Sequence, residues 1–302
     1  MAPPTATYTE TVDVEDVFTA TKAKKEEEGH NRLVPKGHEW AENPNDVQVE
    51  GWVGPPKFTD KLQEREYLKG RLALAFRIFG KNGFEEGVAG HITLRDPINP
   101  HMFWVNPMGV PFSLIKASDL LLVDEDGKVV DGGPVRILNQ AAFTIHSAIH
   151  KARPDVNCAA HCHSMYGRTF AALGKKLDMI TQDSCMFYND VGLYESFKGV
   201  VLAKEEGQRI VKAIGNKKAC ILQNHGLLTA ASTIEAAIFW FVSLDRCCHT
   251  QLLADAAGQT KKIDEEDVDY TYRLTGSPVA GWFCGKSIFD VVIDELGDKY
   301  LK

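Results

Sequence analysis

Apolar side chains recur at helical spacing from residue 60 onward. In the segment DKLQEREYLKGRLALAFRIFGKNG they stand at positions 62, 67, 68, 72, 75, 76 and 79. Residues three or four apart lie on one face of a helix, so this spacing predicts a helix that buries that face. Asn82-Gly83 closes the run, because glycine readily adopts the left-handed conformation that ends many helices.

The chain then alternates between β-like runs and helical patterns. Short runs rich in apolar, β-branched and aromatic residues predict strands over 91–96, 102–107 and 119–124. Longer periodic segments predict a helix over about 138–153, a strand ending at His163, a helix over about 204–215 and a strand ending at His225. Ser232-Thr-Ile-Glu235 has the spacing of a capping box and predicts a long helix that runs to about Asp255.

These patterns divide the chain into three parts. Residues 61–257 form one α/β domain, and no internal repeats divide it. Residues 1–60 hold the charged run KAKKEEEGH and proline-rich ends without an apolar period, which indicates a partly irregular N-terminal extension. Residues 258–302 form a C-terminal tail with a charged linker, KKIDEEDVD, and a short apolar segment, SIFDVVIDEL.

Composition and charge exclude several classes of protein. Of 302 residues, 44% are hydrophobic and 25% charged, which supplies a core and excludes disorder as the main state. The 34 basic residues are outnumbered by 41 acidic ones, so a nucleic-acid partner is not expected. No apolar run reaches the roughly 18 to 20 residues of a membrane span, and the N-terminus lacks a secretory pattern. Seven cysteines, an odd number in apolar surroundings, indicate reduced thiols and a cytoplasmic location.

Histidines provide the clearest chemical signal. His161 and His163 stand two apart at the end of a predicted strand, so they point to the same face. His225 stands at the end of another strand, whereas Cys162 points to the opposite face and belongs to the core. Three imidazole ligands that leave an open position are typical of a catalytic metal site. Zinc is the first expectation, and manganese, iron and cobalt suit the same ligands.

Four ordered segments resemble the class II aldolase/adducin head family over about residues 65–257. They are GVAGHITLRDP (87–97), NPMGVPFSLIKASDLLLVD (106–124), IHSAIHKARPDVNCAAHCHSMYG (145–167) and LQNHGLLTAASTIEAAIFWF (222–241). The resemblance implies a three-layer α/β/α fold with a mostly antiparallel central sheet. It also implies a homotetramer with sites near subunit interfaces, and a divalent metal held by His161, His163 and His225.

The sequence departs from the aldolases of this family in two ways. Their catalytic Glu lies 19 residues before the first histidine of the pair, where this chain has Ala142, and residues 133–151 contain no carboxylate. Alanine cannot carry protons, so the standard aldolase mechanism is in doubt. The phosphate-binding positions have also changed, and they now hold Gly90-His91, Met108-Gly109, Gln140 and Ala141. We therefore expect a substrate without a phosphate group.

Other residues that could move protons have competing interpretations. Glu86 and His91 flank the GVAG loop that borders the site in family enzymes and are the catalytic candidates. A solvated loop acid and a packing or surface histidine are the respective alternatives. Tyr166 can reach the site or be a core tyrosine. Family aldolases also use a tyrosine from a neighbouring subunit's C-terminal tail, for which Tyr270 and Tyr272 are possible counterparts.

One further histidine pair, His146 and His150, is spaced i, i+4 on the predicted helix 138–153. No third ligand is close in sequence, so we expect structural or surface roles for both.

Two functions remain open. The first is a metal-dependent lyase-type enzyme that performs aldol cleavage, decarboxylation or dehydration on a small hydroxy or keto compound. The second is a non-catalytic, adducin-like interaction module with a vestigial metal site, which the missing Glu favours. The three retained histidines favour the enzyme, because a scaffold has no physical need for them.

Overall fold

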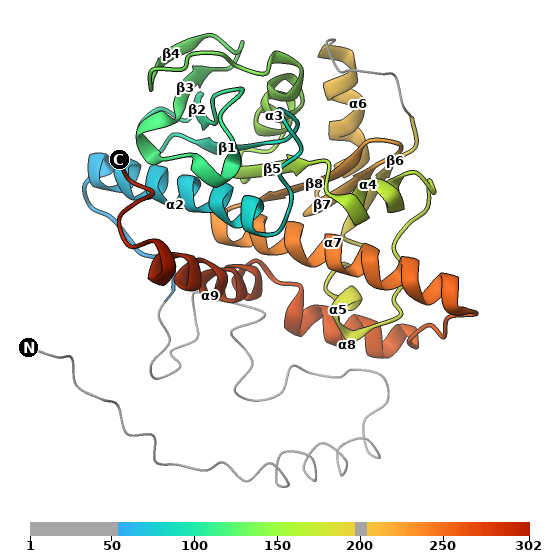
Figure 1. Cartoon of the computed structure of the whole chain (residues 1–302). Helices are drawn as coiled ribbons and strands as arrows, with labels where there is room; N and C mark the ends of the chain where they lie inside the picture. The colour runs from blue at the N-terminus through green and yellow to red at the C-terminus, as the bar shows by residue number, and fades with distance from the viewer. Residues whose placement is uncertain (1–53, 197–203) are drawn as a thin grey trace, which may run out of the picture.

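The computed structural model describes residues 54–196 and 204–302, in which eight strands form one sheet in the order β4-β3-β2-β1-β5-β8-β7-β6 (Figure 1). The strands are β1 (His91–Arg95), β2 (Met102–Val105), β3 (Leu121–Asp124), β4 (Val129–Gly132), β5 (Cys158–Cys162), β6 (Val191–Tyr194), β7 (Ala219–Leu222) and β8 (Gly226–Ala231). Every neighbouring pair is antiparallel except β6 and β7. The expected mostly antiparallel sheet is confirmed. Most of the predicted N-terminal extension lies outside the described residues.

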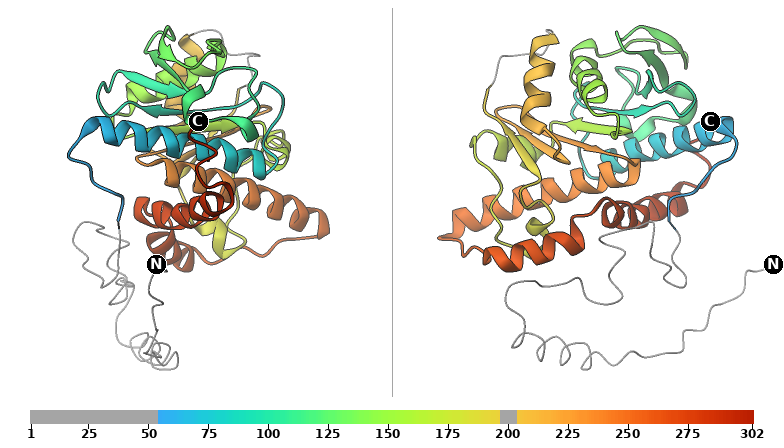
Figure 2. Two further views of the ribbon diagram at one scale, coloured as in Figure 1. Left: turned by 60° about the vertical axis from the view of Figure 1, so that its left-hand side comes forward. Right: turned by 180° about the vertical axis from the view of Figure 1, so that it is seen from behind.

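Helices cover both faces of this sheet and complete the expected three layers (Figure 2). One face carries α3 (Gln140–Ala152) and α6 (Lys204–Ile214), and the other carries α2 (Lys61–Lys81), α4 (Met165–Ala171), α7 (Ile234–Ala257) and α9 (Pro278–Leu296). The two shorter helices are α5 (Gln182–Cys185) and α8 (Glu265–Thr275), and 3-10 turns occupy Phe112–Leu114 and Ala117–Asp119. No helix in the described part of the chain has both the length and the apolar character needed to cross a membrane.

Neighbouring side chains of β5 point to opposite faces of the sheet, and this alternation sets the direction of His161. Cys158, Ala160 and Cys162 of β5 belong to the apolar core that includes α2 and α7. His161 points to the opposite face, toward α3, because side chains alternate along a strand. Cys162 is fully buried, so its predicted place in the core is confirmed.

The helix α2 begins and ends as its sequence predicts. The Asp60 side chain accepts a hydrogen bond from the backbone N–H of Leu62 at 2.8 Å and so caps the first turn. Asn82 follows the last helical residue, and Gly83 adopts a φ of +73°. The buried face packs aromatic rings against α7, with the ring centres of Phe79 and Phe241 4.8 Å apart.

The start of α7 differs from the prediction by one residue. Thr233, not Ser232, is the N-cap, and its side chain accepts a hydrogen bond from the backbone N–H of Ala236. Glu235 was expected to close a capping box, but its carboxylate turns into the core and pairs with Arg71 of α2 at 2.8 Å. The demand of a buried arginine for a counter-ion therefore overrides the local capping pattern.

The strand predicted to end at His225 is also corrected. It ends at Leu222, and residues 223–225 form a tight turn into β8. The strand β8 was not predicted, because Gly226–Ala231 is almost entirely buried and lacks polar alternation.

Residues 258–302 contain two helices, α8 and α9, and α9 packs along α7. Gly285 allows the close approach, because a Cβ atom there would lie 2.3 Å from the backbone oxygen of Glu235. Gly281 does the same beside Trp240, where a Cβ atom would lie 2.5 Å from the ring.

The pair between Arg71 and Glu235 gives a test of this packing. Both side chains are 8% exposed, so Arg71→Ala leaves a buried carboxylate without a partner. We expect a loss of roughly 3–5 kcal/mol in the free energy of unfolding, measured by urea denaturation. The double variant Arg71→Met/Glu235→Leu removes both charges and is expected to lose much less. Arg273→Ala, which breaks the exposed pair with Asp269, is the control, and an equal loss there would contradict the interpretation.

Candidate metal centre

Three histidines converge where β5 ends and the turn between β7 and β8 begins. The nitrogens of His161, His163 and His225 that are available as ligands lie within 4.8 Å of one another. Their ring centres are 4.7 to 5.2 Å apart. Antiparallel pairing of β5 with β8 sets His161 opposite Leu228, which brings the preceding turn beside the end of β5. The structure thus brings together all three predicted ligands.

The backbone of the turn is shaped to bring His225 close to β5. Asn224 adopts the left-handed conformation, with a φ of +57°, which asparagine tolerates better than most residues. Two residues later stands Gly226, where a Cβ atom would lie 2.9 Å from the backbone oxygen of Cys162. The same atom would lie 3.6 Å from the rings of His161 and His163. A glycine is therefore needed for the turn to approach the ligand pair.

Burial keeps the three imidazoles neutral, which is the form that binds a metal. It lowers the pKa of His161 well below its ordinary value, and the neighbouring His225 adds to this. Burial, followed by the effect of His163, lowers the pKa of His225 to about 4. Burial and then the nearby Arg168 also lower the pKa of His163.

One ligand is oriented by the backbone. The Nδ1 atom of His161 lies 2.7 Å from the carbonyl oxygen of Leu227 and donates a hydrogen bond to it. The Nε2 lone pair of His161 is therefore left for a ligand bond, as is usual for metal-binding histidines. Neutral imidazoles with converging nitrogens fit a divalent transition metal such as zinc.

The structure places His91 beside this cluster, deep in the protein. It lies opposite His161 in the pairing of β1 with β5, and its ring centre is 5.4 Å from that of His161. It is 3% exposed, and its ring lies against the backbone of Ala142, although neither ring nitrogen makes a hydrogen bond of normal geometry to any residue in the described part of the chain. Burial, and then His225, lower its pKa to about 3, against a smaller opposing effect of the Ala142 backbone. His91 is thus a buried residue next to the position where family aldolases carry Glu.

Glu86 lies at the more exposed side of the cluster. A tight turn from Glu86 to Ala89 holds it, and Gly90 closes this loop onto β5 with a φ of +92°. A Cβ atom at Gly90 would lie 2.8 Å from the Cβ atom of Cys162. The Glu86 carboxylate pairs with Arg168 at 3.4 Å and acts on the pKa of His163. Glu86 is therefore a partnered side chain beside the histidines, not an isolated loop acid.

The second histidine pair is buried and structural, so a surface role is wrong. The hydroxyl oxygen of Thr93 lies 2.8 Å from Nδ1 of His146 and 2.8 Å from Nε2 of His150. His150 also contacts the carbonyl oxygen of Val156 at 3.2 Å, whereas Nε2 of His146 has no partner. The ring centre of His146 is 3.9 Å from that of His91, so this pair supports the wall behind the site.

The tyrosine candidates lie in different surroundings. Tyr166 is 38% exposed, so its predicted place in the core is wrong, and its ring stacks on His249 with centres 3.5 Å apart. The Tyr272 hydroxyl donates a hydrogen bond to Asp190 at 2.8 Å within the same chain. Tyr270 is half-buried on α8.

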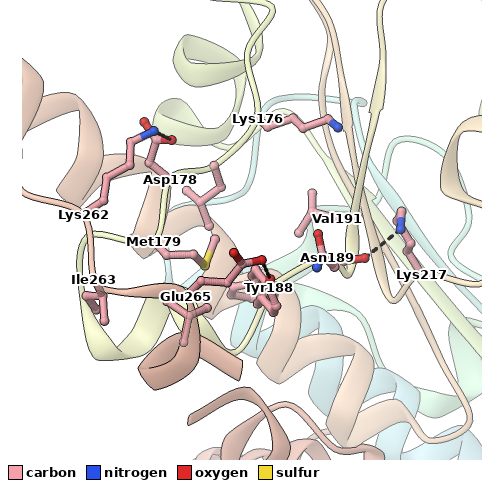
Figure 3. Close-up of a pocket in the computed structure, with 13 residues that line it drawn as sticks. Lys176, Asp178, Met179, Tyr188, Asn189, Val191, Lys217, Lys262, Ile263 and Glu265 are labelled. Carbon is pink, nitrogen blue, oxygen red and sulfur yellow. Dashed lines mark hydrogen bonds and ion pairs between the residues drawn. The ribbon is translucent and has the colours of Figure 1, made fainter. Parts of the chain in front are cut away.

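A cavity of about 310 Å³ lies at another part of the molecule (Figure 3). It opens at the start of β6 and β7, and its lining includes Lys217, Asn189 and Val191. His225 follows the opposite end of β7, and none of the three clustered histidines lines the cavity. This cavity and the histidine cluster are therefore separate features.

Arg168 was missed by the sequence analysis. It stands five residues after His163, in the first turn of α4. In the sequence, the only indication of its role is that a basic residue stands shortly after His163. Its partner Glu86 is 82 positions away in the chain. Only the folded loop brings the two charges together.

The sequence pattern of the family described as Class II Aldolase and Adducin N-terminal domain matches residues 70–252. This match covers more than half of the chain. The chain belongs to this family.

Relatives in the family carry different names. Decarboxylase NovR of Streptomyces niveus is 47% identical over 76% of this chain and 84% of its own length. A Streptomyces roseochromogenus subsp. oscitans protein named 4-hydroxy-3-prenylphenylpyruvate oxygenase/4-hydroxy-3-prenylbenzoate synthase is 46% identical, over 76% of this chain and 82% of its own. The solved L-fuculose 1-phosphate aldolase from Glaciozyma antarctica PI12 is 49% identical, with a TM-score of 0.78 over 82% of this chain and 97% of that one. The class II aldolase fold expected from the sequence is confirmed.

The shared hydrogen bonds of Thr93 can be tested directly. Thr93→Val keeps the shape of the side chain but leaves the buried nitrogens of His146 and His150 without their partner. We expect a loss of about 1–3 kcal/mol in the free energy of unfolding, measured in urea. Thr169→Val is the control, because that exposed hydroxyl only contacts the carbonyl of Met165 in its own helix. Equal stability of the Thr93→Val variant and the native protein would show that the histidine wall does not depend on this hydroxyl.

Proposed function

We propose that this class II aldolase family member is a metal-dependent lyase-type enzyme that removes carbon dioxide from a small, non-phosphorylated keto or hydroxy acid. The observation that carries the proposal is the cluster of His161, His163 and His225, with ligand nitrogens within 4.8 Å of one another. Zinc is the first candidate, and manganese, iron and cobalt are the alternatives.

Two groups of residues have different roles in this proposal, one toward the metal and one toward the substrate. His161, His163 and His225 would hold the metal. A bound divalent ion would polarise a substrate carbonyl and offset the negative charge that remains on its oxygen when the carboxyl group leaves. His91 lies beside the cluster, and its ring nitrogens make no hydrogen bond of normal geometry to the residues that the structure describes, so it can donate a hydrogen bond to a substrate oxygen. Glu86, at the exposed side, can supply or accept a proton.

The missing aldolase Glu supports a reaction with smaller demands on a base. Position 142 is alanine, and the space beside its backbone is occupied by the ring of His91. Retro-aldol cleavage begins by removing a proton from a hydroxyl group, which needs a positioned base. Decarboxylation begins by breaking a carbon–carbon bond, and a proton is needed only afterwards, at the carbon that carried the carboxyl group.

The names of the relatives support the same choice. One is a decarboxylase, and another is named for a phenylpyruvate, which is a keto acid. The L-fuculose 1-phosphate aldolase points to a different substrate, but the phosphate-binding positions implied by the family resemblance are His91, Met108, Gln140 and Ala141 here. A keto acid and a sugar phosphate are therefore both needed as test substrates.

The homotetramer and the cytoplasmic location also belong to this proposal, because the family resemblance implies the first and the cysteine content favours the second. An adducin-like interaction module remains the alternative function. It would have no need to hold one buried and two half-buried imidazoles whose nitrogens converge, because burying polar groups without partners lowers stability.

Metal removal tests the proposed reaction. We expect the zinc- or manganese-loaded protein to release carbon dioxide from oxaloacetate, in which the carboxyl group that leaves is β to the keto group, and to leave L-fuculose 1-phosphate intact. Dialysis against a chelator should abolish the release, and added metal should restore it. His163→Ala should lower the rate by about a hundredfold or more and resist restoration. The rate with the same metal but no protein is subtracted.

His101→Ala is the matched control, because the His101 side chain is 81% exposed and pairs with Glu125. It should keep the native rate. Cleavage of L-fuculose 1-phosphate without release of carbon dioxide would contradict the decarboxylase proposal. No turnover of any substrate by metal-loaded protein would favour the interaction module.

A further inference from the structure

A pair of opposite charges lies next to the histidine cluster. Arg168 is in the first turn of α4, where its backbone N–H donates to the carbonyl oxygen of Ser164 at 2.9 Å. Its Nη2 atom lies 3.4 Å from a carboxylate oxygen of Glu86. The two side chains are 38% and 33% exposed, so solvent and small molecules reach both.

This pair is held more loosely than the ion pair between Arg65 and Asp96. Arg65 donates two hydrogen bonds to the buried Asp96, at 2.8 and 2.7 Å. By contrast, Arg168 meets Glu86 at a single contact, and its other side-chain contact is the sulfur of Met165 at 3.7 Å. Among the residues that the structure describes, its Nε and Nη1 atoms have no hydrogen-bond partner. A guanidinium with free donors is suited to bind a carboxylate through two parallel hydrogen bonds.

The charges of the pair act on one of the three clustered histidines, His163. After burial, Arg168 is the largest influence on the pKa of His163 and lowers it, whereas Glu86 acts in the opposite direction. His163 is the half-buried member of the cluster, and His161 on the inner side is 3% exposed. The partly exposed pair of Arg168 and Glu86 therefore lies on the side of the half-buried His163, not on the buried side of His161.

We propose that Arg168 binds a carboxylate group of the substrate and that Glu86 occupies this position until the substrate displaces it. The inference rests on the proposed function and assigns the residue that recognises the carboxylate of its acid substrate. Glu86 is itself a carboxylate, so its contact shows that this group fits beside Arg168. Displacement frees Glu86 next to the bound substrate, where it can exchange a proton.

Exchange of one carboxylate for another predicts effects of opposite sign for the two residues. Removing the guanidinium weakens the binding of an acid, because the charge-assisted hydrogen bonds are lost. Removing the charge of Glu86 strengthens it, because the competing carboxylate of the protein is gone. A purely structural ion pair predicts the same direction for both variants, since either change breaks the same contact.

The probe is malonate, an unreactive dicarboxylate, with malonamide as its neutral counterpart. Binding to the full chain is measured by titration calorimetry, with and without bound zinc. We expect Arg168→Gln to weaken malonate binding by about tenfold or more, and Arg168→Lys to recover part of the loss. Glu86→Gln should tighten malonate binding several-fold. Malonamide binding should not change in any of these variants, and inorganic phosphate should bind more weakly than malonate.

Arg273→Gln is the matched control, because Arg273 is 48% exposed and pairs with Asp269 on α8. It should bind malonate like the native protein. Equal affinities of Arg168→Gln and Arg273→Gln, weaker binding by Glu86→Gln, or phosphate binding as tight as malonate would each overturn the proposal. If metal-free protein keeps the Arg168 dependence but the loaded protein turns over no keto acid, only the proposed function fails. Turnover with an unchanged malonate affinity in Arg168→Gln would reject only the carboxylate site.

Discussion

The antiparallel pairing of β5 with β1 and β8 is the constraint on which the candidate site depends. On one side it sets His91 opposite His161, and on the other it brings the turn that carries His225 beside the end of β5. The hydrogen-bonding register is rigid, since a slip of one residue would turn His161 and His163 to the other face of the sheet. The apolar side chains of Cys158, Ala160 and Cys162 prevent such a slip, because they would have to leave the core. The core packing of β5 therefore both stabilises the domain and fixes the direction of His161.

The sequence predicted the features that residues close together in the chain decide by themselves. His161 is on β5 and His163 lies one residue past its end, so their spacing of two still sends both side chains to one face, and the helix α2 carries its own cap and apolar stripe. The predictions failed where distant residues decide the outcome. Glu235 belongs to a capping pattern in the sequence but pairs with Arg71, 164 positions away. The strand β8 lacks alternation because both of its faces are covered. The partnership of Arg168 with Glu86 arises only when the loop before β1 folds onto β5.

The polar groups around the site differ in how many hydrogen-bond partners they have. Thr93, His146 and His150 form a hydrogen-bonded wall on the inner side, where one hydroxyl serves two imidazoles. Nearer the cluster, His91 is as deeply buried, but its nitrogens make no hydrogen bond of normal geometry to the described residues. At the open side, Glu86 and Arg168 share one long contact. Unsatisfied polar groups lower stability, so their concentration at one end of the sheet is what a site for metal and substrate requires.

Elemental analysis by plasma mass spectrometry tests the central claim most directly. The protein is purified without a histidine tag or chelator, so that its own ligands decide the metal content. The account predicts close to one divalent metal per chain, and a content near background in His163→Ala protein whose circular dichroism spectrum is unchanged. Absence of metal in the native protein, with none taken up from zinc, manganese, iron or cobalt solutions, would contradict the account and leave the three histidines without a catalytic role.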